Sequence, residues 1–153
     1  MKNKLAIGAL ALAILFTSSS AFAAKPTSMS EFKGRVESVS TRMDSVLNKF
    51  ESVMNKAEDK GYNTSNAQEA YDASIVKRDT AKSEVSSLIS MIDAAIADGA
   101  TAPTAEIRAQ VKDTKDALLA YRDSVKELRD DLKAAIDEHK GEGTPAPVAD
   151  PAV

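Results

Sequence analysis

Apolar residues recur along much of this chain at alternating steps of four and three, which constrains the fold more than any other feature of the sequence. That spacing places one apolar stripe along a helix and is typical of a coiled-coil seam. The clearest runs are Phe32, Val36, Val39, Met43, Val46, Phe50, Val53 and Ala57, and then Ile107, Val111, Thr114, Leu118, Tyr121, Val125, Leu128, Leu132 and Ala135. A looser run between them follows Ala67, Tyr71, Ser74, Arg78, Ala81, Val85, Leu88, Ile92 and Ala95. The pattern predicts an all-α fold.

The three runs predict helices at about 28–60, 65–98 and 102–139. Helices of similar length that are joined by short turns pack antiparallel to their neighbours. We therefore expect one domain at 28–140, folded as an antiparallel up-down-up three-helix bundle with coiled-coil-like heptad seams.

Capping residues mark the ends of these helices. Ser28 and Glu31 have the spacing of a capping box, in which side chains bond the free backbone N–H groups of the first turn. A second box is expected at Ser65 and Gln68. Proline is accepted in the first turn of a helix, so Pro103 is expected inside the third helix. The stop signals are Gly61, Gly99 and Gly141, because glycine readily adopts the left-handed conformation that follows many helices.

Folding the helices back at the turns predicts which seam residues share a layer of the core. A packed core needs large side chains to meet small ones across the helices. The expected layers are Phe32 with Ile92 and Val111, Val39 with Val85 and Leu118, Met43 with Ala81 and Tyr121, and Val53 with Tyr71 and Leu132. If these layers are right, Leu118→Ala costs about 2–5 kcal/mol of stability by opening a cavity.

Residues 1–23 have the three parts of a cleavable secretory signal peptide. A basic start precedes the apolar run Leu5 to Phe16, and a small-residue cleavage site ends at Ala23. A membrane span needs about 20 apolar residues, more than this run supplies. We expect cleavage after Ala23, no membrane insertion afterwards, and a periplasmic or extracellular location. A flexible lead-in at 24–27 and a disordered Pro/Ala/Gly tail at 141–153 should flank the bundle.

Composition argues against several classes of chemistry. The chain has no cysteine, which excludes disulfides, thiolate metal sites and a cysteine nucleophile. Its formal net charge is −3 at pH 7 and becomes more negative when a leader with Lys2 and Lys4 is removed. Basic residues alternate with acids along the chain, which favours neither nucleic acid nor an anionic membrane as a partner. No catalytic, metal or nucleotide motif is found, so we expect no enzyme activity, metal or cofactor.

Two polar residues stand out. Arg78 interrupts the apolar seam of the second helix, where a buried guanidinium needs a carboxylate such as Asp44 or Asp123. It is a candidate polar contact in the core, but a long cationic side chain also packs its stem and extends its head to solvent, and this second interpretation is favoured. His139 is the only histidine, and its place near a helix C-terminus indicates a structural role rather than a metal site.

Asn63, Thr64 and Ser65 together fit the glycosylation sequon and lie in an exposed turn of the expected fold. Asn63 is therefore a candidate modification site of an exported chain. An asparagine that simply forms the turn before a helix start explains the same three residues equally well.

The leader, the turn Gly61-Tyr62-Asn63 and the helical sequence Leu132-Lys133-Ala134-Ala135 carry a resemblance. With them the chain resembles small exported three-helix-bundle proteins of uncharacterised function from uncultured bacteria and archaea, from which no functional residue transfers. It is also similar to periplasmic helical chaperones of the Skp and Spy kinds in export, size and helix length. It departs from those chaperones because they are basic or carry family repeats that this chain lacks.

The expected function is a non-enzymatic structural or protein-interaction module of the cell envelope, because long helices offer surface rather than a deep pocket. The alternative is a periplasmic chaperone or stress adaptor that holds unfolded clients. The expected partner is another protein of unknown identity or a second copy of this chain, since heptad seams allow self-association.

Overall fold

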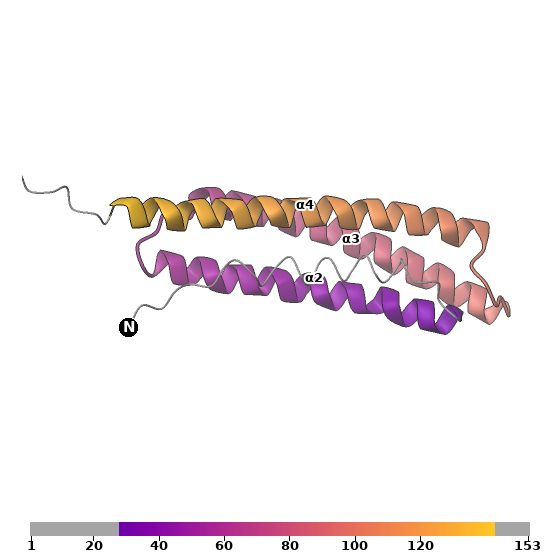
Figure 1. Cartoon of the computed structure of the whole chain (residues 1–153). Helices are drawn as coiled ribbons and strands as arrows, with labels where there is room; N and C mark the ends of the chain where they lie inside the picture. The colour runs from indigo at the N-terminus through magenta and orange to yellow at the C-terminus, as the bar shows by residue number, and fades with distance from the viewer. Residues whose placement is uncertain (1–27, 143–153) are drawn as a thin grey trace, which may run out of the picture.

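The computed structural model describes residues 28–142, and the regular structure of this part is three helices that lie side by side (Figure 1). Helix α2 spans Met29–Glu58, α3 spans Ser65–Ala97 and α4 spans Ala105–Glu142. Consecutive helices run in opposite directions, which confirms the predicted all-α, up-down-up bundle. The predicted leader and lead-in lie outside the described residues, as does the tail beyond Glu142.

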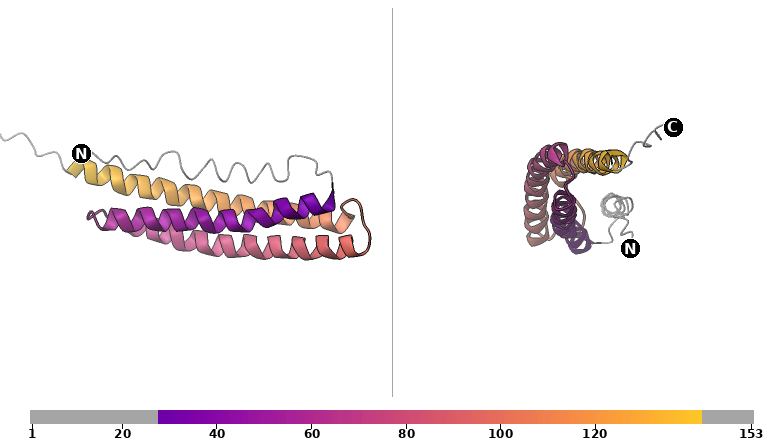
Figure 2. Two further views of the ribbon diagram at one scale, coloured as in Figure 1. Left: turned by 90° about the horizontal axis from the view of Figure 1, so that it is seen from below. Right: turned by 90° about the vertical axis from the view of Figure 1, so that its left-hand side faces the viewer.

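Helix α3 packs closely against both of its neighbours, whereas α2 and α4 touch each other over a much smaller area. Figure 2 shows α3 running along one side of the other two helices. The side of the bundle between α2 and α4 is therefore the least tightly closed.

The buried stripe of α2 is rotated toward α3 relative to the predicted seam. Leu47 and Met54, which the heptad pattern leaves out, are only 0% and 2% exposed. Val53, which the pattern places in the seam, is half-buried. Leu47 and Met54 follow the predicted seam residues by one position, on the flank that carries Asp44, and Asp44 contacts α3. The rotation follows from the greater contact of α2 with α3 than with α4.

The first half of α4 shows the same rotation, since Thr114 and Tyr121 are fully buried whereas Val111 and Leu118 are half-buried. In its second half Val125, Leu128 and Leu132 are all buried, as the heptad seam predicts.

The predicted layer that joins Val85 to Leu118 is wrong by about one helical turn. The hydroxyl of Thr114 donates a hydrogen bond of 3.3 Å to the carbonyl of Glu84, so Thr114 lies beside this part of α3. The connection at 98–104 is long enough for α4 to begin beside α3 about one turn before the end of that helix. Leu118→Ala should therefore leave a smaller cavity than the heptad pattern predicts, because the Leu118 side chain is only half-buried.

The first predicted cap and the second helix start, at Ser65, are confirmed, whereas the cap expected at Ser65 and the start of the third helix are corrected. Ser28 is the N-cap of α2, and its hydroxyl accepts a bond of 3.1 Å from the backbone N–H of Glu31, which is one of the two bonds of the predicted box. Ser65 does not cap α3, because its own N–H and hydroxyl both bond the side chain of Asn63, at 3.2 and 2.8 Å. The third helix begins beyond Pro103, where the hydroxyl of Thr104 accepts a bond of 3.3 Å from Ile107 N–H.

Both turns between helices close with glycine in the left-handed conformation. Gly61 has φ +81° and Gly99 has φ +77°. After α2, Tyr62 N–H bonds the carbonyl of Ala57 at 3.1 Å, and after α3, Ala100 N–H bonds the carbonyl of Ala95 at 2.8 Å. These are the six-to-one bonds of Schellman motifs, and they confirm the stop signals expected at both glycines. Gly141 lies within α4, which ends at Glu142, so it does not end its helix.

Gly61→Ala and Gly99→Ala are each expected to lower the free energy of unfolding by about 1 kcal/mol, because a Cβ atom disfavours positive φ. The matched control is Gly34→Ala inside α2, where an added Cβ meets nothing within 4 Å. This control should stabilise the protein by roughly 0.5–1 kcal/mol through higher helix propensity. Urea unfolding of the three variants measures both signs, and a loss at Gly34 equal to the losses at the turns would contradict the assignment.

Candidate functional site

Arg78 is the centre of a polar cluster on the α2–α3 seam. Its guanidinium lies 3.6 Å from Asp44 of α2 and 2.8 Å from Asp79 of α3. Lys82, one turn further along α3, lies 2.8 Å from the same Asp44. The Arg78 side chain is 22% exposed, so its head reaches the surface while its stem packs in the seam. The cluster therefore joins two helices and leaves no unpaired charge inside the core.

Asp123, the other partner considered for Arg78, belongs to a different group on the surface of α4. It accepts hydrogen bonds from Arg122 at 2.8 Å and from Lys126 at 3.4 Å. The hydrogen bond from Arg122 is the main cause that holds the pKa of Asp123 below its usual value. These are exposed neighbours on one helix, and such pairs contribute little stability.

Tyr121 provides a direct polar link between α4 and α2. Its phenol is fully buried and donates a hydrogen bond of 3.0 Å to the backbone carbonyl of Met43. Burial raises the pKa of Tyr121 well above the usual tyrosine value, because the phenolate would lose its hydration. The contact shows that the Tyr121 side chain reaches Met43, the α2 residue predicted to lie opposite it. A neutral, bonded phenol in a packed layer serves structure rather than proton transfer.

A second polar set joins α3 to α4. Gln110 donates a hydrogen bond of 2.6 Å to the Glu84 side chain. Among the described residues, every buried side-chain nitrogen or oxygen has a hydrogen-bond partner. Some of these groups join helices, as Gln110 and Thr114 do, and others, such as Ser74, bond the backbone of their own helix. Each buried polar group is thereby satisfied, which avoids the cost of burying an unbonded one.

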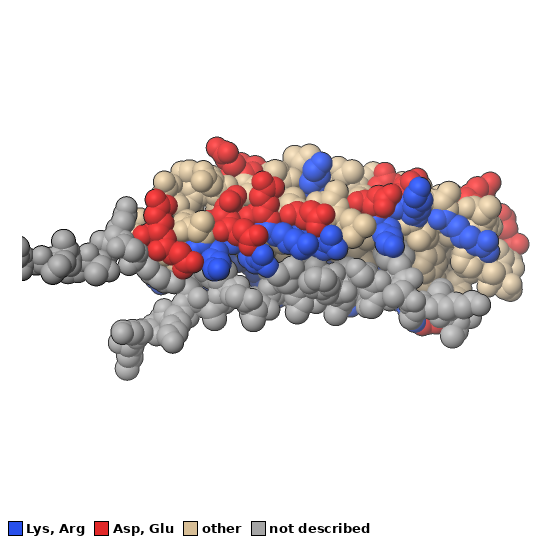
Figure 3. Space-filling view, turned by 45° about the horizontal axis from the view of Figure 1, so that its top comes forward, with Lys and Arg blue, Asp and Glu red and all other residues tan. Residues whose placement is uncertain are grey.

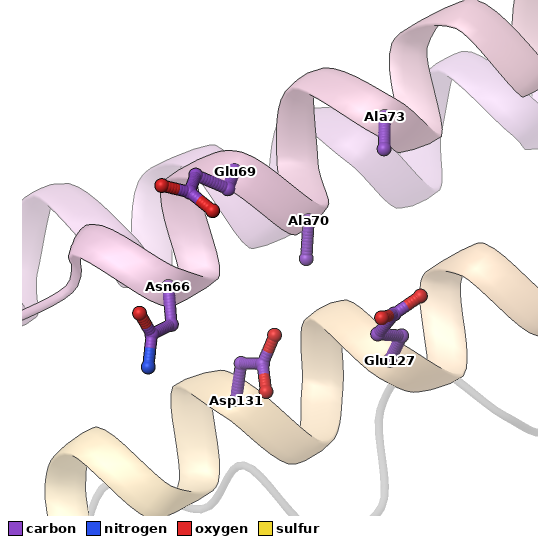
Figure 4. Close-up of a pocket in the computed structure, with 6 residues that line it drawn as sticks. All are labelled: Asn66, Glu69, Ala70, Ala73, Glu127 and Asp131. Atoms are coloured by element: carbon purple, nitrogen blue, oxygen red, sulfur yellow. The ribbon is translucent and has the colours of Figure 1, made fainter.

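Acidic and amide side chains line an open hollow of about 300 Å³ between the start of α3 and the second half of α4 (Figure 4). Asn66 and Glu69 come from α3, and Glu127 and Asp131 come from α4, with Ala70 and Ala73 at the wall. In Figure 4 the side chains of Asn66 and Asp131 extend into the space between the two helices. Sequence reasoning missed this group because its members are far apart along the chain.

The acids of this hollow do not form a metal site. Within the part of the chain that the structure describes, no group of three or more His, Asp or Glu side chains is arranged to hold a metal ion. The small alanine side chains at the wall leave room between the helices. The hollow is therefore a shallow acidic surface depression.

His139 lies against the turn between α2 and α3. Its ring stacks on Tyr62 with the ring centroids 4.3 Å apart and the planes tilted by 39°. Tyr62 is half-buried against the core and follows the left-handed Gly61. The contact joins the last turn of α4 to the turn between α2 and α3, which agrees with the structural role expected for the histidine.

Asn63 is exposed, and its side chain caps the local turn before α3. The carbonyl oxygen of Asn63 accepts bonds from both the N–H and the hydroxyl of Ser65. Thr64, between them, is buried and donates a bond of 2.6 Å to Glu58. The turn gives these three residues structural roles, and the modification of Asn63 stays a prediction.

Hydropathy along the described helices shows none that is long and apolar enough to cross a membrane.

Comparison with known proteins gives no match to a protein-family model, to a curated protein sequence or to a solved structure. The resemblance to small exported helical proteins therefore stays a prediction from the sequence.

Proposed function

We propose that this protein is exported and acts as a non-enzymatic protein-interaction module of the cell envelope. The observation that carries the proposal is that the polar groups inside the described bundle form hydrogen bonds within the fold. Those inside the bundle are bonded to one another or to backbone, as Tyr121 is to Met43. What the three helices offer to a ligand is long external surface, and long helical surfaces are suited to recognition of other chains.

Export is supported by the composition of residues 1–23, which have the basic, apolar and small-residue parts of a cleavable leader. N-terminal sequencing of the protein purified from its host is expected to begin at Ala24. Fractionation should place this shortened chain outside the cytoplasm. A chain that keeps Met1 and remains in the cytoplasm would overturn the proposal of export.

The interaction role is tested by affinity capture with the chain that begins at Ala24 from an extract of its own envelope, followed by quantitative mass spectrometry. We expect one or two proteins retained in stoichiometric amounts. A broad set of unrelated exported proteins, together with suppressed aggregation of an unrelated unfolding protein at equimolar amounts, would instead indicate a chaperone. Retention of nothing above the level of a bead-only control would contradict both roles.

A further inference from the structure

Charges that alternate along the chain are sorted by side around α2. The acids between Phe32 and Ala57 are Glu37, Asp44 and Glu51, at seven-residue spacing. Asp44 bonds Lys82 of α3, which shows that this acidic flank faces α3. Seven-residue spacing keeps side chains on one face of a helix in a coiled coil. Lys33 is the one basic residue on this flank, and it pairs with Glu37 and with Asp93 of α3. On the opposite flank of the apolar stripe, at the same seven-residue spacing, are Arg35, Arg42, Lys49 and Lys56.

Helix α4 is sorted in the same way. Gln110 bonds Glu84, and Asp131 lines the hollow next to α3, so both mark the flank that faces α3. The opposite flank carries only basic and apolar residues over ~37 Å of helix. These residues are Arg108, Lys112, Lys115, Leu119, Arg122, Lys126, Arg129 and Lys133. Figure 3 shows a line of Lys and Arg side chains along much of the molecule, with many of the Asp and Glu side chains above it.

The two basic flanks border the same side of the bundle, and together they are called the basic face. It lies between α2 and α4, the two helices that contact each other least. Like charges that flank a helix seam repel across it, which opposes close approach of the two helices. The half-buried apolar side chains Val111 and Leu118 lie next to the basic row of α4, and Val53 lies next to that of α2. The face thus combines an incompletely covered apolar seam with two rows of positive charge.

Part of this charge is available to a partner, although Arg35 pairs with Glu31 on α2. Arg122 and Arg129 bond the adjacent Asp123 and Asp130, at 3.0 and 2.8 Å. Exposed pairs of this kind are worth about 0–1 kcal/mol, so a partner carboxylate exchanges with them at little cost. Lys112, Lys115 and Lys133 form no ion pair with any residue of the described part. The protein is acidic overall, but folding gathers basic residues that are interspersed in its sequence into one cationic face.

We propose that the basic face binds an acidic amphipathic helix of a partner protein, which completes a four-helix bundle. The inference rests on the proposed interaction role and names its surface and its class of partner. A helix with acids at heptad spacing beside an apolar stripe matches both features of the face. Its apolar residues cover Val53, Val111 and Leu118, while its acids lie against the two basic rows.

Two other occupants fit the face less well. A second copy of this chain has an acidic outer row on α4, but the positions interleaved with it are Ala109, Ala120 and Ala134, which give no bulky apolar stripe. An anionic membrane would be expected to receive protruding apolar side chains as well as charge. The exposed large apolar residues of the described part are Val76 and Ile96, both on α3. The observations therefore favour a helix of a different protein.

The test uses the chain that begins at Ala24 and a synthetic four-heptad peptide with leucine at its seam positions and glutamate at the flanking positions. Two matched peptides replace all the glutamates by lysine or all the leucines by serine. Binding is measured by fluorescence anisotropy, and helix formation by circular dichroism. We expect the glutamate–leucine peptide to bind at least about tenfold more tightly than either control and to gain helix on binding. Its binding should weaken as the salt concentration increases.

Matched charge reversals locate the binding surface. K112E with K115E changes the basic face, and K60E with K77E makes the same change in net charge elsewhere; all four lysines are exposed. We expect the first pair to weaken peptide binding about tenfold or more and the second to leave it nearly unchanged. Equal loss in both pairs, equal binding of the serine peptide or of anionic vesicles, or occupation of the face by a second copy in sedimentation would overturn the inference.

The same variants separate this inference from the proposed function. If a stoichiometric envelope partner is retained equally by K112E/K115E and by the unaltered chain, the basic face is not its site, while the interaction role stands. If no envelope partner is retained by any form, the interaction role itself fails.

Discussion

Leu128→Ala is expected to lower the free energy of unfolding by about 2–5 kcal/mol. Leu128 is 0% exposed and lies on the part of α4 that packs against the rest of the core. Truncation removes the burial of the side chain and leaves a cavity whose walls relax only partly. Urea unfolding followed by far-ultraviolet circular dichroism measures the loss, provided that the slope of the transition is unchanged.

The matched control is Leu118→Ala, the same substitution on the same helix. Leu118 is half-buried beside the open α2–α4 side, so its truncation should cost no more than about half as much. The heptad pattern alone treats Leu118 and Leu128 as equal members of one seam. Equal losses at the two positions would therefore contradict the rotation of the first half of α4 toward α3.

Tyr121→Ala is expected to destabilise the protein by about 3–5 kcal/mol, the range for removing a large buried aromatic side chain. Tyr121 is fully buried, and its phenol joins α4 to the backbone carbonyl of Met43 on α2. Its loss removes both core volume and a direct hydrogen bond between these two helices. Thermal and urea unfolding measure the effect.

Tyr121→Phe separates the hydrogen bond from the packing and should cost only about 1 kcal/mol. It also tests the pH dependence. In the folded chain the pKa of Tyr121 is raised by burial, whereas in the unfolded chain a tyrosine titrates near 10. The neutral phenol thus contributes stability that is complete below about pH 10 and is lost as the pH rises above it. The unaltered protein should lose stability more steeply than Tyr121→Phe above pH 10, and parallel curves would contradict a buried phenol.

The turns show how much of the fold was predictable. Gly61 and Gly99 announced the ends of two helices because glycine alone adopts positive φ without strain, and both stops are confirmed. Gly141 carries the same local signal but lies inside α4. The starts were less predictable, since Asn63 and Thr104 supply the bonds that Ser65 and Pro103 were expected to mark. Several side chains compete for the same free N–H groups at a helix start, and local sequence does not rank them.

The polar residues were predicted unevenly. Asp44 was named as a partner for Arg78 because the turns bring these positions of α2 and α3 to the same height. The hollow lined by Glu69, Glu127 and Asp131 was not found, because it depends on the register between α3 and α4. That register differs from the expected one by about a turn, which changes which polar side chains of α3 and α4 lie opposite each other.

The sequence by itself determined that this chain forms three antiparallel helices, because apolar spacing, glycine stops and short connections each act over a few neighbouring residues. Only the tertiary structure decided which flank of each apolar stripe is buried. The helix repeat allows Leu47 or Val53, and Thr114 or Leu118, to turn inward with little change in backbone. The choice depends on how the three helices share contacts, and close packing of α3 against both neighbours leaves the basic flanks of α2 and α4 on the remaining side.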